Sequence, residues 1–317
     1  MTELELYSTH RIRNRPEMLA KVRQAVIEHR FSKLSGWEEG GEERYAADID
    51  RHAFKRHDST VEYIVPWVNQ SFPLEGKTIV EVGCGTGSST AAFAKFSGHV
   101  FGYDIAGASV EGAKARLAAH GLADRATFCA AEPQALLKTI EERHREEKAD
   151  VVLMFALLEH QTLAERLETL RIGQAVTKPG GVIVIAETPN RLTYFDHHTS
   201  QLPFFHMLPL DLQLLIAKES PRRDFRENIR LKIEECGDGD PPLEHLIRWG
   251  QSVSFHEFDL AFDNVDSRII GSGDHPNIMR LRPPKPEEVA LRSFMEETGI
   301  KRHPGFMRYF LDLIIRV

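Results

Sequence analysis

Four short stretches of this 317-residue sequence bring chemistry-bearing residue types close together. In chain order they are Gly83-Cys84-Gly85-Thr86-Gly87, Asp104, Glu159-His160 and Asp196-His197-His198. Closely spaced glycines let a ligand approach the backbone, an ionised carboxylate accepts hydrogen bonds from ligand hydroxyls, and histidine exchanges a proton near neutral pH. Together these residues predict a site that binds a polar small molecule and can move a proton.

The elements that must position these residues follow from the hydrophobic pattern. Beyond Gly76, short apolar runs alternate with longer amphipathic ones, which is typical of β-α-β crossovers and a mostly parallel sheet. Strands are expected near Thr78–Val82, Val100–Tyr103, Ala126–Cys129, Val151–Phe155 and Val182–Ala186, and helices near Ser88–Phe96, Ser109–His120, Gln134–Glu147 and Leu163–Val176. The predicted fold is α/β, with a doubly wound, mostly parallel sheet of seven strands.

The flanking segments have different patterns. Helices near Pro16–His29 and Thr60–Gln70, separated by a glycine-rich acidic loop at Gly36–Gly41, predict an N-terminal helical cap over residues 1–75. The predicted core covers residues 76–189, a lid or substrate insertion with a helix near Asp211–Lys218 covers residues 190–250, and residues 251–317 complete the sheet. For this last part we expect a strand near Ser252–Leu260, a helix near Glu287–Thr298 and a terminal strand near Phe306–Ile315.

The spacing of the glycine loop indicates which ligand it takes. A dinucleotide-binding loop has its third glycine, or an alanine, five residues after the first, and here that position is Ser88. The form found, Glu81-Val-Gly83-Cys84-Gly85-Thr-Gly87, resembles the first motif of the class I S-adenosylmethionine-dependent methyltransferases. The resemblance implies that this loop lies against the methionine and ribose parts of S-adenosylmethionine, with Glu81, Gly83, Cys84, Gly85 and Gly87 as cofactor-binding residues.

Further cofactor contacts follow from the same resemblance. Asp104, at the end of the second strand and 21 residues after Gly83, is expected to accept hydrogen bonds from both ribose hydroxyls, with Ile105 beside it. An alternative is that Asp104 only caps the next helix. The end of the third strand implies adenine contacts from Ala131 and Glu132, although Glu132 could instead only complement a helix dipole.

The fourth strand and its loop, which end in Phe155-Ala-Leu-Leu-Glu159-His160, resemble the small-molecule branch of this family. Ligands of open α/β sheets bind at the topological switch point, here between the first and fourth strands. Phe155 is therefore expected to contact the cofactor, and His160 is a candidate general base. The alternative is that Glu159 and His160 cap or orient the following helix. Arg56 is a further candidate, either for the cofactor carboxylate or for a solvated surface.

The segment after the fifth strand carries the remaining catalytic candidates, Asp196, His197 and His198. Its Thr-Pro-Asn-Arg, Asp-His-His and Leu-Pro-Phe runs resemble bacterial methyltransferases that occur with glycan and envelope biosynthesis enzymes. Three interpretations stay open: these residues supply a base and substrate contacts, they bind a divalent metal, or they stabilise the loop. We expect catalysis by His160, Asp196, His197 and His198, and no metal.

Composition sets limits on partners and compartment. The formal net charge of −7 argues against binding nucleic acid through a broad basic surface. The sequence contains no run of 18 apolar residues, so no membrane-spanning helix is expected. The three cysteines show no paired spacing, and the N-terminus lacks an apolar signal core, so we expect a cytoplasmic protein. The pattern does not indicate an oligomeric state.

The predicted function is methyl transfer from S-adenosylmethionine to a small-molecule or glycan acceptor, preferably at oxygen. One alternative is an NAD(P)-dependent oxidoreductase, because a strand, a glycine loop and an acidic strand end also occur there. Another is a binding protein that keeps the fold without catalysis.

Overall fold

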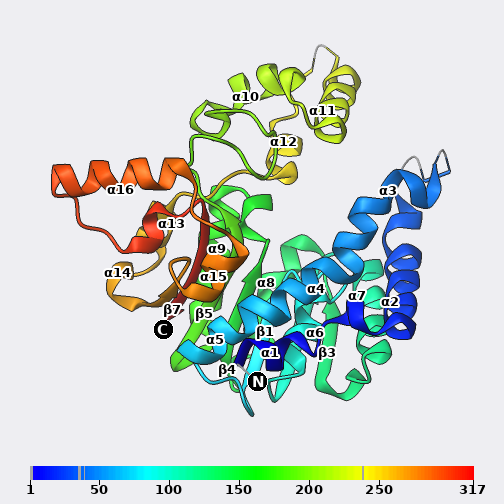
Figure 1. The fold of residues 1–317 in the computed structure, drawn as a ribbon. Coiled ribbons are helices and arrows are strands. Elements are labelled where there is room, and N and C mark those ends of the chain that lie inside the picture. Colours follow the sequence, from blue (N-terminus) through cyan, green and yellow to red (C-terminus); the bar gives the residue numbers. More distant parts are fainter. Residues whose placement is uncertain (1–2, 35–36, 39, 238) are drawn as a thin grey trace.

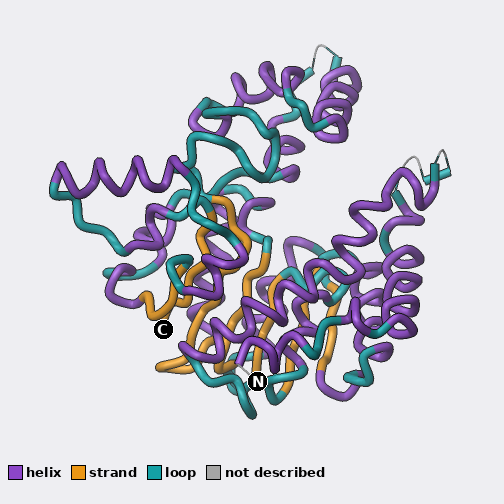
Figure 2. Tube along the Cα trace, viewed as in Figure 1, coloured by secondary structure: helices purple, strands orange, loops and turns teal. Residues whose placement is uncertain are grey.

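The computed structural model describes residues 3–34, 37–38, 40–237 and 239–317. Its centre is a seven-stranded sheet in the order β3-β2-β1-β4-β5-β7-β6, with helices on both faces (Figures 1 and 2). The strands are β1 Thr78–Val82, β2 His99–Asp104, β3 Ala126–Ala130, β4 Ala149–Phe155, β5 Thr177–Pro189, β6 Ile269–Ser272 and β7 Phe310–Arg316. Strands β1 to β5 are parallel, and β7 pairs antiparallel with β5 and β6. The predicted fold class is confirmed.

Both faces of the central strands are buried, because successive side chains of a strand point to opposite faces. Val80, Val82 and Met154 belong to the core on one face, whereas Ile79 and Val151 belong to the core on the other. The chain order also places β1 beside β4, so the switch point lies where the sequence predicts it.

The crossover helices also match the expected segments. They are α6 Ser88–Ala94, α7 Gly107–Ala119, α8 Pro133–Arg143 and α9 Leu163–Val176. Helix α9 begins with a capping box in which the Thr162 hydroxyl and the Glu165 carboxylate each accept from the other residue's backbone N–H. This cap fixes the start of α9, directly after the loop that carries Glu159 and His160.

The N-terminal region is more helical than predicted. Short helix α1 Glu3–Ser8 precedes α2 Pro16–His29, which agrees with the first predicted helix. The second predicted helix is only part of an unbroken helical run, which comprises α3 Gly41–Asp50, a π-helical stretch Arg51–Lys55, α4 Arg56–Ser59, a second π-helical stretch Thr60–Ile64 and α5 Val65–Ser71. The expected loop at Gly36–Gly41 lies partly outside the described residues.

Residues 190–250 carry a small apolar core of their own. Helices α10 Leu210–Ile216, α11 Arg223–Cys236 and α12 Leu243–Trp249 pack around Phe205, Phe225 and Leu246. This lobe stands above the carboxyl ends of the parallel strands (Figure 1). The predicted helix near Asp211–Lys218 corresponds to α10.

The C-terminal part contains the one wrong strand prediction. Residues Phe255–Ala261 form helix α13, not part of a strand, because Ser254 and Glu257 make a capping box and Phe255 and Phe258 are buried at helical spacing. The seventh strand is instead β6. Helices α14 Val265–Arg268, α15 Pro276–Leu281 and α16 Pro286–Thr298 complete the chain, and α16 matches its prediction. Within the described residues, no helix has the length and apolar character needed to cross a membrane.

Candidate active site

The loop between β1 and α6 turns through three glycines with positive φ angles, at Gly83, Gly85 and Gly87. A Cβ added at Gly83 would lie 2.8 Å from Leu157 Cδ1, and one added at Gly87 would lie 2.9 Å from Ala113 Cβ, so close packing explains these two glycines. A Cβ added at Gly85 would meet no atom within 4 Å. The loop is therefore packed on both sides and open at its middle glycine.

Asp104 holds this loop in place from the end of β2. Its Oδ2 accepts from the Gly85 N–H at 2.8 Å, and its Oδ1 accepts from the Ala106 N–H at 2.8 Å. Each oxygen keeps further acceptor capacity, because an ionised carboxylate offers about four lone-pair sites. The next residue, Ile105, has a side chain that is 56% exposed and offers an apolar surface.

Glu81 lies beneath the loop. Its side chain is fully buried, and its two carboxylate oxygens accept hydrogen bonds from the hydroxyls of Ser89 and Thr90. Burial raises the pKa of Glu81 to about 7, against the opposing effect of the two hydroxyls. In this geometry Glu81 ties β1 to α6. Cys84 is also buried, and burial raises the pKa of its thiol.

The third and fourth strands end beside this loop. The Ala131 N–H donates to the Asp104 carbonyl at 3.2 Å, and Glu132 is exposed at the position preceding α8. Phe155 is 4% exposed, and the Arg56 guanidinium lies 5.7 Å from its ring centroid. The predicted cofactor residues thus lie at the same edge of the sheet.

Two residues at strand ends have unusual backbone angles. Ala156, directly after β4, and Glu187, near the end of β5, have φ angles of 48° and 58°. Such conformations are costly for residues other than glycine and often occur at functional sites. Glu187 pairs with Arg56 at 3.3 Å and with Arg282 at 3.0 Å.

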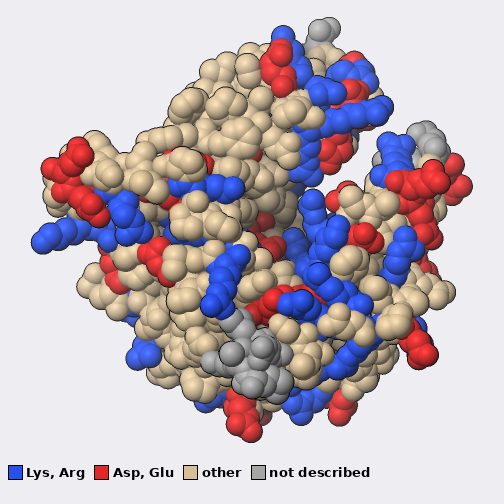
Figure 3. Space-filling view, viewed as in Figure 1, with Lys and Arg blue, Asp and Glu red and all other residues tan. Residues whose placement is uncertain are grey.

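The N-terminal helical region and α7 contribute positively charged side chains near the glycine loop. Figure 3 shows Lys and Arg side chains gathered in the hollow between the lobe of residues 190–250 and the arm that carries α3. Arg30 directly follows α2. Burial lowers its pKa, the charge of Arg56 lowers it further, and the charge of Asp104 raises it. Arg116 is fully buried and donates to the Thr86 carbonyl at 2.7 Å and to two carbonyls of the first π-helical stretch, those of His52 and Ala53.

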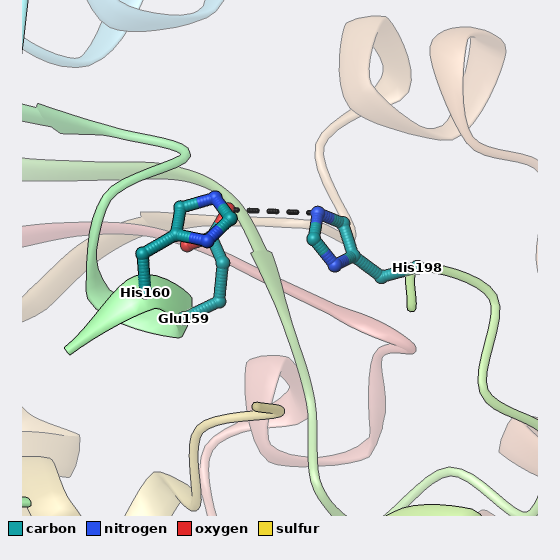
Figure 4. A group of neighbouring side chains, drawn as sticks. All are labelled: Glu159, His160 and His198. Atoms are coloured by element: carbon teal, nitrogen blue, oxygen red, sulfur yellow. Dashed lines mark ion pairs between the residues drawn. The ribbon is translucent and has the colours of Figure 1, made fainter. Parts of the chain in front are cut away.

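Glu159, His160 and His198 form a second cluster at the same edge (Figure 4). His198 reaches toward the other two from the loop after β5, and the Nε2 atoms of both histidines lie 3.8 Å from Glu159 Oε1. Burial raises the pKa of Glu159 to about 8, against the opposing effects of its own backbone N–H and of Arg56. Burial also lowers the pKa of His160, and it lowers that of His198 to about 3.

Asp196 and His197 point elsewhere. The Asp196 carboxylate accepts from the backbone N–H groups of His198, Thr199 and Ser200, and its Oδ1 lies 2.9 Å from His206 Nε2. Burial alone would raise its pKa, but His206 and the backbone amides hold the pKa below its usual value. His197 Nε2 lies 2.9 Å from Glu287 of α16. This packing favours a structural role for Asp196 and separates His197 from the cluster.

A family model described as "Methyltransferase domain" matches residues 73–229, from just before β1 into α11. These residues form a class I methyltransferase domain. The methyltransferase domain includes the glycine loop, Asp104 and the cluster of Glu159, His160 and His198. Class I methyltransferases use S-adenosylmethionine, so the family match favours the methyltransferase prediction over the oxidoreductase alternative.

Curated relatives are similar to part of the chain. Ubiquinone biosynthesis O-methyltransferases are 29% identical over 127 residues in Stutzerimonas stutzeri and 30% identical over 123 residues in Rhodopseudomonas palustris. These alignments cover 40% and 37% of this chain, and 50% and 42% of the relatives. The chain thus spans about half or less of the length of the curated relatives it matches.

Among solved structures, an amino pentose methyltransferase from Micromonospora echinaspora, with S-adenosylmethionine bound, is 24% identical at a TM-score of 0.35. That match covers 45% of this chain and 55% of the other. Magnesium protoporphyrin IX methyltransferase from Synechocystis, also with S-adenosylmethionine bound, is 21% identical at a TM-score of 0.34, over 41% and 58% of the two chains.

Sequence reasoning brought most of these residues together but missed three. Arg30 directly follows α2 and Arg116 lies in α7, and no local sequence pattern marks either arginine as part of the site. Glu187 lies near the end of β5, and no role was predicted for it from the sequence. Its positive φ angle, which marks it structurally, has no signal in the sequence because glycine or asparagine is the usual residue there.

Proposed function

We propose that this protein transfers a methyl group from S-adenosylmethionine to an oxygen atom of a small-molecule or glycan acceptor. The observation that carries the proposal is the combination of an open glycine at position 85 with the Asp104 carboxylate, at the switch point of the methyltransferase domain. The curated relatives, which are named O-methyltransferases, support oxygen as the acceptor atom.

The residues present fit the cofactor. The space beside Gly85 would take the part of the cofactor that must approach the backbone most closely. Asp104 keeps acceptor capacity for the ribose hydroxyls, and exposed Ile105 offers an apolar surface for the adenine ring. Arg30 and Arg56 supply positive charge for the carboxylate of the methionine part. When bound, S-adenosylmethionine supplies an activated methyl group.

The protein's own residues would align the acceptor with the methyl group, exclude water from the site and accept the proton of the acceptor hydroxyl. An acceptor hydroxyl that takes the methyl group must lose its proton, and Nε2 of His160 and of His198 are the Lewis-basic atoms at the end of β4 and the loop after β5. Burial lowers the pKa of both imidazoles, so both are neutral at pH 7 and each keeps a nitrogen lone pair. A pKa of about 3 makes His198 a weak proton acceptor, so His160 is the candidate base. Holding the reactants in line can supply much of the acceleration, because no covalent intermediate with the protein is needed.

The decisive experiment has two parts. Isothermal titration with S-adenosylhomocysteine should give one site per chain, and Asp104→Ala should weaken it about 10-fold or more, since charge-assisted hydrogen bonds contribute about 1.5–3 kcal/mol. A screen of hydroxylated acceptors with methyl-labelled cofactor should then find transfer.

Two results would contradict the proposal. Binding of S-adenosylhomocysteine that is unchanged in Asp104→Ala would show that the cofactor is held elsewhere. Tight cofactor binding without transfer to any hydroxylated acceptor would favour the binding-protein alternative.

A further inference from the structure

Glu159 is a buried carboxylate without a cation of its own. Its side chain is fully buried, and within the described part of the chain neither of its oxygens has a hydrogen-bond partner of normal geometry. The nearby guanidinium groups form their ion pairs with other carboxylates: Arg56 pairs with Glu187 at 3.3 Å, and Arg166 pairs with Glu257 at 3.0 Å. A buried carboxyl group whose two oxygens have no partner is costly whether it is ionised or protonated, and a ligand that pairs these oxygens would remove that cost.

The two neighbouring histidines both turn an unprotonated nitrogen toward Glu159. His160 Nδ1 lies 2.9 Å from the Arg248 carbonyl, which can only accept, so this nitrogen carries the proton. His198 Nδ1 lies 3.0 Å from the Thr199 hydroxyl, which itself donates to the Gly250 carbonyl, so this nitrogen carries the proton as well. The Nε2 lone pairs of both rings are therefore available on the Glu159 side. Such backbone and hydroxyl partners are also what orients metal-binding histidines.

The three ligand atoms are close enough to share one ion. They lie within 4.8 Å of one another, and both Nε2 atoms lie 3.8 Å from Glu159 Oε1. Metal–ligand distances of about 2.1 Å place tetrahedral ligands about 3.4 Å apart, so shifts of about 1 Å would close the site. The histidine side chains are 42% and 25% exposed, which gives an ion access from one side.

We infer that Glu159, His160 and His198 bind a divalent transition-metal cation, with coordination positions left open for an oxygen of the methyl acceptor. Two imidazole nitrogens and one carboxylate suit Zn²⁺, Fe²⁺, Mn²⁺ or Co²⁺, whereas Mg²⁺ prefers oxygen ligands. The second half of the inference rests on the proposed function: a hydroxyl bound to the cation would lose its proton more readily. With the cation bound, both Nε2 lone pairs are coordinated, so this proton would pass to solvent and not to an imidazole.

This differs from the sequence-based expectation of no metal. The metal interpretation considered there joined Asp196, His197 and His198, which are adjacent in sequence but point in different directions in the structure. The cluster instead joins the loop after β4 to the loop after β5, with 37 residues between His160 and His198. Only the fold brings these three residues together.

The test measures metal binding without any acceptor or cofactor. The tag-free protein is stripped with EDTA and titrated with CoCl₂, followed by visible absorption and calorimetry, with MgCl₂ as the contrasting ion. We expect one Co²⁺ per chain and no comparable Mg²⁺ binding. Glu159→Gln and His198→Ala should each weaken Co²⁺ about 10-fold or more, while His197→Ala, the neighbour outside the cluster, should leave it unchanged.

The outcomes separate the two proposals. No stoichiometric Co²⁺ binding, or equal affinity in wild type, Glu159→Gln and His198→Ala, would overturn the metal site. If Glu159→Gln fails to fold by circular dichroism, His198→Ala decides, since its side chain is partly exposed on a loop. Co²⁺ binding without methyl transfer would sustain the metal site and contradict the proposed function. Transfer that persists unchanged after EDTA treatment would overturn the role in acceptor binding.

Discussion

At the residue scale, Gly85 differs from the other two loop glycines because its missing side chain faces open space and not protein. Its φ angle of 51° still makes any side chain strained, so a substitution mixes backbone strain with blocked ligand space. A matched glycine separates the two effects. Gly121, after α7, has a φ angle of 69° and likewise has no atom within 4 Å of an added Cβ.

We therefore predict that Gly85→Ala weakens S-adenosylhomocysteine binding about 10-fold or more, because the new methyl group occupies the space against the backbone. Both variants should lower the melting temperature by a similar amount, but Gly121→Ala should keep the wild-type affinity for S-adenosylhomocysteine. Calorimetry and thermal melting measure the two quantities. Equal affinities for the two variants would mean that the ligand does not approach Gly85.

Glu81 gives a second prediction at this scale, for pH. Its pKa is about 7 in the folded state against an ordinary value of 4.5, mainly through burial, with Asp104 adding to the rise and Arg56 opposing it. Between these two pH values the folded state holds a proton that the unfolded chain has released. Stability must therefore fall as pH rises through this window.

For Glu81 alone, the free energy of unfolding should fall by about 3 kcal/mol between pH 4.5 and 7. Glu81→Gln has no titrating group at this position and should lack this part of the slope. Urea unfolding at several pH values measures both proteins. Parallel stability curves for wild type and Glu81→Gln would show that Glu81 is ionised in the folded state throughout.

At the scale of elements, Arg116 joins α7 to two other parts of the molecule. It donates to the Thr86 carbonyl of the glycine loop and to the carbonyls of His52 and Ala53, and it has no carboxylate partner among the described residues. Burial lowers its pKa to about 9, with Arg56 adding to the effect. The side chain thus fixes the N-terminal helical run against the loop that the cofactor is proposed to touch.

Replacing Arg116 by Met should lower the free energy of unfolding by about 3 kcal/mol or more, because three buried carbonyls lose their donor. Arg125→Met is the matched control, since Arg125 makes one such bond, at 2.7 Å to the Ser97 carbonyl. Its expected cost is about 1 kcal/mol. Similar urea midpoints for the two variants would contradict this role of Arg116.

Elements also show how far sequence alone could reach. The five parallel strands and four crossover helices could be predicted because each carries its own period and its own end signals, such as Gly83 after β1 and the Lys178-Pro179-Gly180 turn before the main run of β5. The strand prediction at Ser252–Leu260 was wrong because it overlooked a helix start signal, the capping box of Ser254 and Glu257. The cluster of Glu159 and His198 could not be predicted, because it depends on two loops that only the sheet brings together.

At the scale of the whole molecule, Arg248 connects the lobe of residues 190–250 to the sheet. Its side chain donates to the His160 carbonyl at 3.0 Å and pairs with Glu165 at 2.7 Å, and its own carbonyl lies 2.9 Å from His160 Nδ1. The pairing with Arg248 lowers the pKa of Glu165 to about 2. Helix α12 is thus tied to the loop that precedes α9.

We predict that Arg248→Ala raises hydrogen–deuterium exchange in α12 and in residues 158–162, without changing S-adenosylhomocysteine affinity. Arg230→Ala is the control, because within the described residues Arg230 forms ion pairs only with Glu227 and Glu234 of its own helix. Exchange that rises equally in both variants, or in neither, would contradict the role of Arg248 in connecting the lobe to the sheet.

The contact between Gly83 and Leu157 links the cofactor loop to the loop of Glu159 and His160. Leu157 occupies the space that a Cβ at position 83 would need, so one loop cannot shift far without displacing the other. Occupancy at either place should then alter affinity at the other, and thermodynamic reciprocity requires the two changes to be equal in free energy. A nucleoside at one end of this contact and an ion or acceptor at the other would then each change the binding of the other.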